Sequence, residues 1–467
     1  MAYKLIVFFT LCCMLAGCGG DREKTSVLLI SIDSLRPDHL GCYGYNKNTS
    51  PAIDGLASDG MIFLNAVSTT SWTLPAHVSL FTSLFNSGHR VNDNSDRIDE
   101  QRIMLAEIFK AHGYRTAGFV SGPFMHPAFA FDQGFDEYVY CTGYAGTPPQ
   151  TKKNPISGQV QEASHRDISS PKVNSRALPW LEKNGKEPFF LFLHYFDVHY
   201  DYIPPPPYDD MFVDPGYSGG IDPSNFIHNE GINASLPPED LAYLFGLYDG
   251  EIRFTDDHVG AVIEKLKSLG VFEKTLIIVT SDHGDEFFEH GEKGHFKTLF
   301  DESIKIPLVM HLPGKIPTGR QDASLVRIID VMPTILDLCG LPQSEETMGA
   351  SLLPLLQDGK KDLALQNLAE LYVKGHGMVS LQTDDWKVVY NLETQQTALY
   401  RLLEDPDEQH PILLTPGEPD YEKARKLFRL ADSVTAIGKS LPTGGKTERR
   451  ELDPDTLQKL KSLGYIE

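Results

Sequence analysis

The sequence is poor in basic residues and in cysteine for its length. Lysine and arginine total 42 against 64 aspartate and glutamate residues, so the formal charge is −22. That charge repels polyanions, and no basic stripe with interleaved aromatic residues offsets it, so nucleic acid is excluded as an expected partner. The few cysteines form no Cys-x-x-Cys pair, and Cys42, Cys141 and Cys339 are too scattered for a disulfide framework. We interpret these three as structural residues.

Long apolar runs are also missing, and the one apolar stretch near the N-terminus is short. Residues 5–15 are apolar, follow Lys4 and precede small residues, a pattern that predicts a signal peptide over residues 1–17. Leu15-Ala16-Gly17-Cys18 resembles a bacterial lipoprotein signal. The resemblance implies acylation of Cys18, a tether over residues 18–25 and a lipid-anchored location on the periplasmic or extracellular side of the cell envelope. An ordinary secretory signal is the alternative.

The rest of the composition is that of a globular enzyme. Hydrophobic residues make up 41% of the 467 residues, which predicts one large domain with a smaller one beside it. Apolar strand patterns alternate with helical patterns, which is typical of an α/β fold with a mainly parallel central sheet between helices. The expected strands lie at residues 26–32, 116–120, 189–193 and 275–280, and the expected helices at residues 105–114 and 259–269.

Two stretches rich in glycine, proline and polar residues, 141–172 and 203–238, are predicted to be long functional surface loops. After about residue 365 the pattern changes to short strands separated by turn residues, at 378–381, 386–390 and 398–402. We therefore expect a catalytic domain over residues 26–364 and a smaller, antiparallel C-terminal subdomain over residues 365–467.

Candidate metal ligands follow two of the predicted strands. Asp33 comes directly after the first strand, and Asp282 with His283 follows the strand at 275–280. The carboxyl ends of parallel strands meet at one edge of a sheet, where ligand sites form. Asp and His side chains suit a borderline divalent cation, so the three residues together predict a metal site. Surface solvation would explain each residue alone but explains the set poorly.

Several segments resemble the sulfatase family of the alkaline phosphatase superfamily. Thr73-Leu74-Pro75-Ala76-His77 stands where that family has its nucleophile motif, with Cys or Ser first and Arg last. Other segments resemble the family in the same order, over roughly residues 26–410. They include Ile32-Asp33-Ser34-Leu35-Arg36, Asp197-Val198-His199, Ser281-Asp282-His283-Gly284 and Phe300-Asp301-Glu302.

The resemblance implies a sulfatase-like fold and a role for each matching residue. Thr73 would bind the metal and attack sulfur or phosphorus to form a covalent intermediate, while Asp33, Asp282 and His283 would hold one divalent ion. His199 and His295 would be catalytic, since imidazole can protonate a leaving alkoxide near neutral pH. His77, Lys297 and Asp197 would contact the substrate. Asp197 could instead orient a histidine or, with His199 and His295, hold a second ion, and Lys297 could be an exposed loop lysine.

The departures from the family pattern bear on cofactor and substrate. Thr73 carries a β-methyl group, so conversion to formylglycine is not expected. Ser34 replaces the second acid and His283 replaces the usual Asn, which favours Mn²⁺ or Zn²⁺ over Ca²⁺. The set Asp-Thr-Asp-His resembles the superfamily's phosphodiesterases and its phosphoglycerol or phosphoethanolamine transferases.

We therefore expect a metal-dependent hydrolase that cleaves a sulfate or phosphate ester of a small molecule, glycan or lipid. A phosphodiesterase or envelope transferase, which passes the covalent group to an alcohol, is the main alternative. An inactive binding lipoprotein is a third, although the complete ligand set argues against it. The sequence does not decide whether the substrate is a sulfate ester or a phosphate ester.

Overall fold

A computed structural model describes residues 24–141, 152–153, 160–161, 168–358, 363–373, 375–444 and 452–462. The predicted signal peptide, the lipidation site Cys18 and most of the tether lie outside these residues. Within the described part of the chain, no helix is both long and apolar enough to cross a membrane. Cys42, Cys141 and Cys339 are free thiols.

The centre of the fold is a nine-stranded sheet in the order β11-β2-β12-β8-β1-β7-β3-β4, with β13 paired to β2. Strand β1 runs parallel to both β7 and β8, and β3 runs parallel to β7 and β4, whereas β12 is antiparallel to β2 and β8. The prediction of a mainly parallel sheet is confirmed. The strands are β1 (Ser26–Ile32), β2 (Met61–Val67), β3 (Arg115–Val120), β4 (Glu137–Tyr140), β7 (Phe189–Tyr195), β8 (Thr275–Thr280), β11 (Lys305–Ile306), β12 (Leu308–His311) and β13 (Arg320–Arg327).

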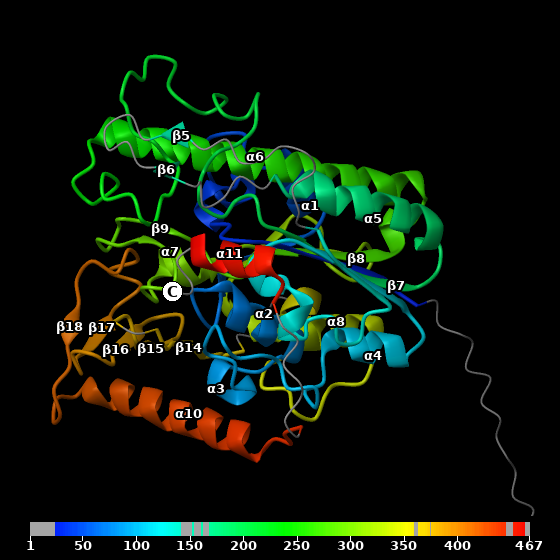
Figure 1. Cartoon of the computed structure of the whole chain (residues 1–467). Coiled ribbons are helices and arrows are strands. Elements are labelled where there is room, and N and C mark those ends of the chain that lie inside the picture. Colours follow the sequence, from blue (N-terminus) through cyan, green and yellow to red (C-terminus); the bar gives the residue numbers. More distant parts are fainter. Residues whose placement is uncertain are drawn as a thin grey trace, which may run out of the picture.

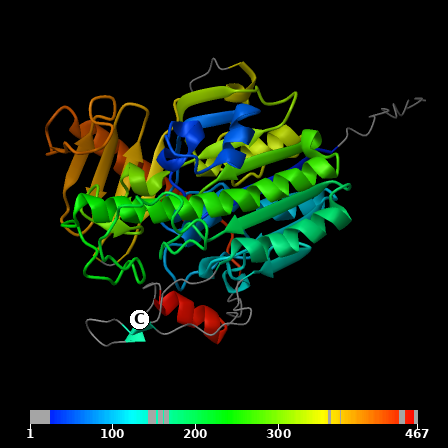
Figure 2. The same cartoon turned by 90° about the horizontal axis from the view of Figure 1, so that it is seen from above.

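Helices cover both faces of this sheet (Figure 1). One face carries α1 (Pro51–Ser58), α5 (Ser170–Asn184) and the long α6 (Pro238–Ser268), which crosses the molecule when it is seen from above (Figure 2). The other face carries α2 (Thr73–Thr82), α4 (Leu105–Ala111) and α8 (Val331–Cys339). Shorter helices are α3 (Asn86–His89), α7 (Asp301–Ile304) and α9 (Leu353–Asp358), and two-residue strands are β5 (Lys152–Lys153), β6 (Val160–Gln161), β9 (Glu286–Phe287) and β10 (Lys293–Gly294).

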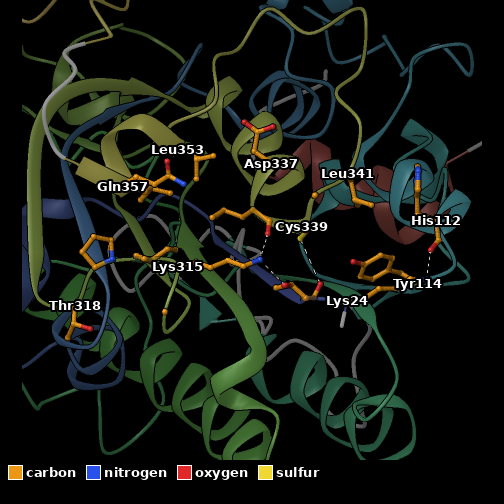
Figure 3. A pocket seen from close by; sticks show the side chains of 17 residues that line it. Lys24, His112, Tyr114, Lys315, Thr318, Asp337, Cys339, Leu341, Leu353 and Gln357 are labelled. Carbon is orange, nitrogen blue, oxygen red and sulfur yellow. Dashed lines mark hydrogen bonds between the residues drawn. The ribbon is translucent and has the colours of Figure 1, made fainter. Parts of the chain in front are cut away.

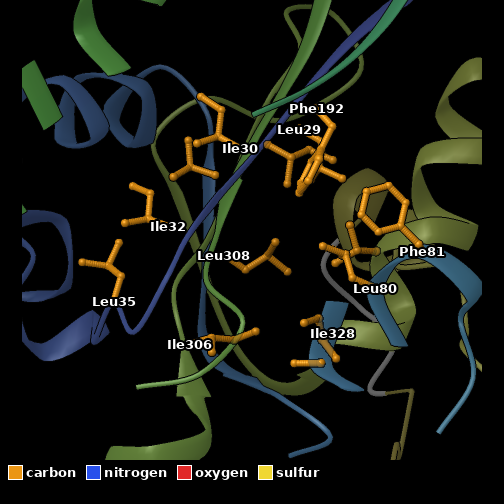
Figure 4. Packing of buried hydrophobic residues seen from close by; sticks show 14 of the residues in the cluster. Leu29, Ile30, Ile32, Leu35, Leu80, Phe81, Phe192, Ile306, Leu308 and Ile328 are labelled. Atoms are coloured by element: carbon orange, nitrogen blue, oxygen red, sulfur yellow. The ribbon is translucent and has the colours of Figure 1, made fainter. Parts of the chain in front are cut away.

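Alternating side chains of β1 fill the core on both sides of the sheet. Leu29 lies with Phe192 of β7 on the face that receives Phe81 of α2, whereas Ile30 and Ile32 point to the opposite face (Figure 4). These side chains are almost wholly buried, and each such burial stabilises the fold by about 1.5–3 kcal/mol. The face shared by Leu29 is also the face of Ser31 and Asp33, because strand side chains alternate.

A separate five-stranded antiparallel sheet follows, as predicted, in the order β14-β15-β16-β17-β18. Its strands are β14 (Asn367–Leu371), β15 (Met378–Gln382), β16 (Lys387–Asn391), β17 (Thr397–Tyr400) and β18 (Ile412–Leu413), followed by α10 (Tyr421–Ser440) and α11 (Pro454–Ser462). The sequence analysis predicted neither helix, although the buried Ala424, Leu427 and Val434 of α10 recur at helical spacing. The helix predicted at residues 259–269 is the last part of α6, whose earlier turns are buried on several sides and show no simple apolar stripe.

A buried ion cluster connects the two sheets. Lys387 of β16 places its Nζ 3.1 Å from Asp301 Oδ1 and 2.9 Å from Glu408 Oε1. Burial alone would lower the pKa of Lys387, but the carboxylates of Glu408 and Asp301 raise it. The C-terminal sheet is therefore attached to α7 through a desolvated charge network.

His290 makes a second contact of this kind, and its protonation predicts a pH effect on stability. Its Nδ1 lies 2.6 Å from Glu302 Oε1 and its Nε2 lies 3.0 Å from the Glu408 carbonyl. Partial burial opposes protonation of the ring, but the hydrogen bond and charge of Glu302 prevail and raise the pKa of His290 to about 9. The stabilisation is thus complete below the unfolded pKa of about 6.5 and is lost as the pH rises through about 9.

We expect the His290→Gln variant to be destabilised by on the order of 2 kcal/mol at pH 6 and by much less at pH 10. Urea unfolding of variant and wild type at both pH values measures this difference. The His228→Gln variant, which changes an exposed histidine, serves as the matched control and should show equal stability to wild type at both pH values. An equal loss for His290→Gln at both pH values would contradict the assignment.

Candidate active site

The predicted nucleophile is the first residue of α2. Thr73 begins the helix, and Pro75 in the first turn is tolerated because the amide there needs no partner within the helix. The N-terminal end of a helix carries a partial positive charge, which favours the ionised form of a hydroxyl placed on it. Thr73 is only 2% exposed, so this charge acts with little screening by solvent.

The ends of β1 and β8 bring the predicted metal ligands beside Thr73. The parallel register pairs Ser31 with Thr280, so Asp33 and Asp282 lie at equivalent positions just beyond the two strands. Thr73 Oγ1 is 3.4 Å from Asp33 Oδ2 and 3.3 Å from His283 Nε2. His283 Nε2 is in turn 3.4 Å from Asp282 Oδ2 and 3.7 Å from Asp33 Oδ1. The structure therefore assembles the four residues that the sequence assigned to the metal.

The turn after β1 is fixed to the turn after β8 by hydrogen bonds. Ser34 has a positive φ of 56°, which is uncommon for a residue other than glycine. Its amide donates to Asp282 Oδ1 at 3.3 Å, and its carbonyl accepts from the Tyr248 hydroxyl of α6 at 2.7 Å. The turn after β8 and helix α6 thus hold Ser34 in this unusual conformation, which sets the direction of the neighbouring Asp33 side chain.

The electrostatics of this cluster fit a bound cation. Burial, followed by the charge of Asp282, raises the pKa of Asp33 well above its usual range. Burial would also raise the pKa of Asp282, but the neighbouring His283, His77 and His194 lower it. Asp282 Oδ2 is buried and makes no hydrogen bond within the described residues. Asp33, Asp282 and His283 can all present ligand atoms to one point, and a divalent ion there would stabilise both carboxylates as anions.

The two histidines predicted to be catalytic lie next to this cluster. The ring of His295 is 4.3 Å from that of His283 and 4.8 Å from that of His199, measured between centroids. His295 Nδ1 is 2.7 Å from Asp285 Oδ1, whose other oxygen accepts from the Tyr202 hydroxyl at 2.7 Å. Burial, and then the charge of His283, lower the pKa of His295. Asp285 therefore fixes the orientation of His295 at the edge of the metal cluster.

The residues predicted to contact substrate lie in three different environments. His77 is buried behind Thr73, with Nδ1 2.9 Å from the Thr73 carbonyl and Nε2 3.0 Å from Ser31 Oγ. Lys297 is partly exposed, and its Nζ is 3.2 Å from Glu292 Oε2. Asp197 accepts hydrogen bonds from the amides and hydroxyls of Ser169 and Ser170 at the start of α5. Asp197 therefore holds the start of α5 in place. Among the described residues, it belongs to none of the groups that could hold an ion.

Two residues of the cluster were not selected from the sequence. Asp285 follows His283 by two positions, and the spacing Asp282-His283-Gly284-Asp285 was the available signal. His194 is the last residue but one of β7, and its Nε2 is 3.4 Å from Asp33 Oδ2. The register pairs His194 with Ser31, so the signal was a polar residue at the carboxyl end of the strand next to β1.

A cavity of about 920 Å³ lies at the other edge of the sheet and has no part in this cluster (Figure 3). It is lined by residues before β1, after α4 and after β12, and by residues of α8 and α9, among them Lys24, Tyr114 and Lys315. Lys315 donates to the Leu338 carbonyl there at 2.6 Å. None of the proposed ligands or catalytic residues lines this cavity.

Comparison with known proteins gives consistent results for sequence and fold. The family profile described as "Sulfatase" matches residues 25–341, and that of "N-sulphoglucosamine sulphohydrolase, C-terminal" matches residues 291–430. The chain is 29% identical over 406 residues to the multifunctional alkaline phosphatase superfamily protein PehA of Trinickia caryophylli, covering 72% of this chain and 78% of that protein. It is 26% identical over 394 residues to iduronate 2-sulfatase of Mus musculus, covering 68% and 69%.

Among solved structures, the phosphonate monoester hydrolase of Agrobacterium radiobacter superposes with a TM-score of 0.69 at 22% identity, covering 89% of this chain and 96% of that one. This similarity supports the arrangement of the central sheet and its helices. The family profile that matches residues 25–341 covers more than half of the chain, so it supports a family assignment in addition to the fold.

Proposed function

Because the chain belongs to the sulfatase family and is a sulfuric or phosphoric ester hydrolase, we propose that it acts through a covalent intermediate on Thr73 at a divalent metal site. The observation that carries the proposal is the position of Thr73 Oγ1, within 3.4 Å of Asp33 and His283 at the start of α2. A metal ion can activate a hydroxyl only if that hydroxyl lies among the ligands of the ion, as Thr73 Oγ1 does here.

The residues divide the chemistry between them. Asp33, Thr73, Asp282 and His283 would hold a divalent ion, which when bound would lower the pKa of the attacking hydroxyl and neutralise charge on the substrate. The N-terminus of α2 stabilises the ionised Thr73 Oγ1. His295, with its Nδ1 held by Asp285, passes a proton from Nε2 to the leaving alkoxide; because its surroundings lower its pKa, the protonated ring is a strong acid that becomes more populated as the pH falls. His199 meets the ring of His295 edge to face and is placed to bind the ester oxygens, together with the partly exposed Lys297.

The donor set supports Mn²⁺ or Zn²⁺ in preference to Ca²⁺. His283 contributes an imidazole nitrogen, and Ser34 replaces a carboxylate by a hydroxyl that donates to Asp33 Oδ1 at 3.1 Å. Calcium prefers six to eight oxygen ligands, whereas imidazole suits the transition metals. The β-methyl group of Thr73 leaves no route to formylglycine, so the intermediate must be resolved by direct attack of water or of an alcohol.

The role of His295 predicts a dependence on the leaving group. We expect His295→Gln to slow esters of alkyl alcohols, which leave poorly, by about 10²–10⁴-fold, and esters of 4-nitrophenol by less than about tenfold. Asp285→Asn should show the same pattern with a smaller effect, because it disturbs only the orientation of the ring. A kcat series against leaving-group pKa for each variant measures this.

The double variant tests whether the two side chains act as one unit. Its loss of kcat should be close to that of His295→Gln alone, because Asp285 acts through His295. A uniform loss across all leaving groups for either single variant would show a structural role and contradict the proposal.

A substrate panel tests the proposed function as a whole. The purified chain, stripped of metal and reloaded with Mn²⁺, Zn²⁺ or Ca²⁺, is assayed against aryl sulfate, phosphomonoester, phosphodiester and phosphonate monoester. Metal-dependent turnover of at least one ester supports the proposal, and no turnover with any metal overturns it. We expect a phosphorus ester to be the better substrate, because Thr73 is unmodified. The named relatives include both chemistries, a sulfatase and a phosphonate monoester hydrolase.

Product analysis in the presence of an alcohol acceptor separates hydrolysis from transfer. A hydrolase leaves glycerol unmodified, whereas a transferase of the phosphoglycerol or phosphoethanolamine type forms a new ester. We propose a small-molecule, glycan or lipid ester as the natural substrate, and a lipid anchor on Cys18 that holds the enzyme at the cell envelope. Replacement of Cys18 by Ala should release the protein from the membrane fraction of a bacterial host.

A further inference from the structure

One part of the long loop before α6 is buried beside the two histidines proposed to act on the substrate. Many residues of this loop, which spans residues 203–238, are exposed, but Phe226 and Ile232 are buried. The Phe226 ring packs against those of Tyr200 and Tyr202, with centroids 6.0 Å and 5.1 Å away. Two hydrogen-bonded attachments hold residues 225–232 in this place, and each leads to one of the histidines.

The first attachment is made by Asp201. Its side chain is buried, and its two carboxylate oxygens accept hydrogen bonds from the amides of Asn225 at 2.5 Å and Phe226 at 2.6 Å. Hydrogen bonds to an ionised group are stronger than those between neutral groups. Asp201 follows His199 by two positions, and His199 Nδ1 lies 2.7 Å from the carbonyl of the residue between them. The loop is therefore fixed directly to the turn that carries His199.

Lys293 of β10 makes the second attachment. Its Nζ donates to the carbonyls of Asn229 and Ile232, each at 2.7 Å, and lies 5.6 Å from the centre of the Phe226 ring. Holding a lysine side chain in one conformation costs entropy, which the two hydrogen bonds and the aromatic face offset. Lys293 precedes His295 by two positions, so this attachment reaches the part of the chain that delivers His295.

Gly294, between Lys293 and His295, lets the loop approach β10 closely. Its φ is 73°, and a Cβ atom there would lie 2.5 Å from Ile227 Cδ1 and 3.2 Å from Tyr200 Cε1. Only glycine fits such a position without displacing its neighbours. The Tyr200 ring also stacks on that of His295, with centroids 5.0 Å apart. Residues 225–232, the turn after β7 and β10 therefore form one closely packed unit around the two histidines.

We propose that Asp201 and Lys293 are positioning residues, which fix residues 225–232 and thereby hold His199 and His295 at the separation that the reaction needs. The rings of the two histidines are 4.8 Å apart. Asp285 fixes the direction of the His295 ring through Nδ1, whereas the two attachments fix the main chain from which each histidine projects. The inference rests on the proposed function for the roles of the histidines, and it adds a role for the loop before α6.

The Lys293→Met variant tests the proposal, because methionine keeps most of the apolar stem and removes both hydrogen bonds. In the mature protein loaded with Mn²⁺ or Zn²⁺, we expect hydrogen–deuterium exchange of peptides covering residues 225–232 and 293–298 to become at least about tenfold faster. We expect kcat to fall by about 10–100-fold for alkyl esters and by less than about threefold for 4-nitrophenyl esters, because a displaced His295 is a less effective acid. Lys293→Arg keeps donors for the two carbonyls and should restore most of both properties.

Asp201→Asn tests the other attachment and should give a different pattern. Asparagine keeps one acceptor oxygen and loses the other, so exchange should become faster in the peptide that covers residues 225–232. We expect kcat to fall by about tenfold for alkyl and 4-nitrophenyl esters alike, because His199 is proposed to bind ester oxygens that both classes share. Should this variant fail to fold, the Lys293→Met variant decides the proposal.

Lys315→Met is the matched control, because Lys315 also donates to a main-chain carbonyl, that of Leu338 at 2.6 Å, but at the opposite edge of the sheet. It should change neither the exchange of these peptides nor the leaving-group dependence. Unchanged exchange in Lys293→Met, or faster exchange with an equal effect on both classes of ester, would overturn the proposal. A wild type that cleaves no ester refutes the proposed function, and exchange of the peptide that contains His295 then still decides whether Lys293 positions it.

Discussion

The Thr73→Ala variant is expected to lose at least about 10³-fold in kcat on every ester that the wild type cleaves, while its thermal midpoint stays within a few degrees. The substitution removes the only atom proposed to attack sulfur or phosphorus, so the covalent route is closed and only binding and charge stabilisation remain. The fold should survive because the alanine methyl occupies part of the same space at the first turn of α2. Initial rates with saturating metal, together with intact-protein mass spectra of trapped intermediates, measure the effect.

Two further variants make this result specific to the hydroxyl. Thr73→Ser keeps the oxygen and should keep most of the activity. Thr82→Ala removes a buried hydroxyl from the other end of the same helix, where it donates to the Val78 carbonyl at 2.7 Å, and should leave kcat unchanged. Equal turnover by Thr73→Ala and the wild type would refute the assignment of the nucleophile.

The Lys387→Met variant is expected to lower the free energy of unfolding by about 3–5 kcal/mol at neutral pH. Methionine fills the space of the lysine stem but leaves Glu408 as a buried carboxylate without a counter-ion, and Asp301 with only the half-exposed Lys305. The loss should shrink as the pH falls, because protonated carboxyl groups carry no charge. Urea unfolding at pH 5 and pH 7.5 measures both the loss and its dependence on pH.

Lys305 provides the matched control for this prediction. Its Nζ lies 3.8 Å from the other oxygen of Asp301, but its side chain is 36% exposed. Solvent-exposed pairs contribute about 0–1 kcal/mol, so Lys305→Met should have a small effect. Equal losses for the two variants would mean that the buried position of Lys387 is not the cause.

The fold was largely predictable where the sequence carries a local pattern. β1 and β8 were predicted with the bounds that the structure shows, because each is a short apolar run ended by polar residues. α4, which ends just before Gly113 with its φ of 71°, was predicted for a similar reason. β13 was not predicted, since it mixes apolar with polar residues, and β2 was not predicted although it is largely apolar. Their pairing depends on partners distant in the sequence.

The site was predictable to the extent that its residues follow strands or match a motif. Asp33, Thr73, Asp282 and His283 were identified in this way, and the structure brings them together. Asp285 and His194 were missed because each matters through the direction of one side-chain atom. An oxygen of Asp285 points at His295, and a nitrogen of His194 points at Asp33. Such directions depend on the register of β7 against β1 and on the loop after β8, which no pattern of residue types reports.

The pairing of β1 also has a consequence for the order in which the protein folds. Ser26 pairs with Thr275 in the finished sheet, so the first strand to be synthesised lacks one neighbour until about 250 further residues have followed. At about 5–20 residues per second, that interval lasts roughly 12–50 seconds. Throughout it an apolar strand with at least one open edge, and two until β7 is synthesised, is available for wrong partners. A chain of this topology should therefore fold slowly and gain yield from a chaperone that shields its first strand.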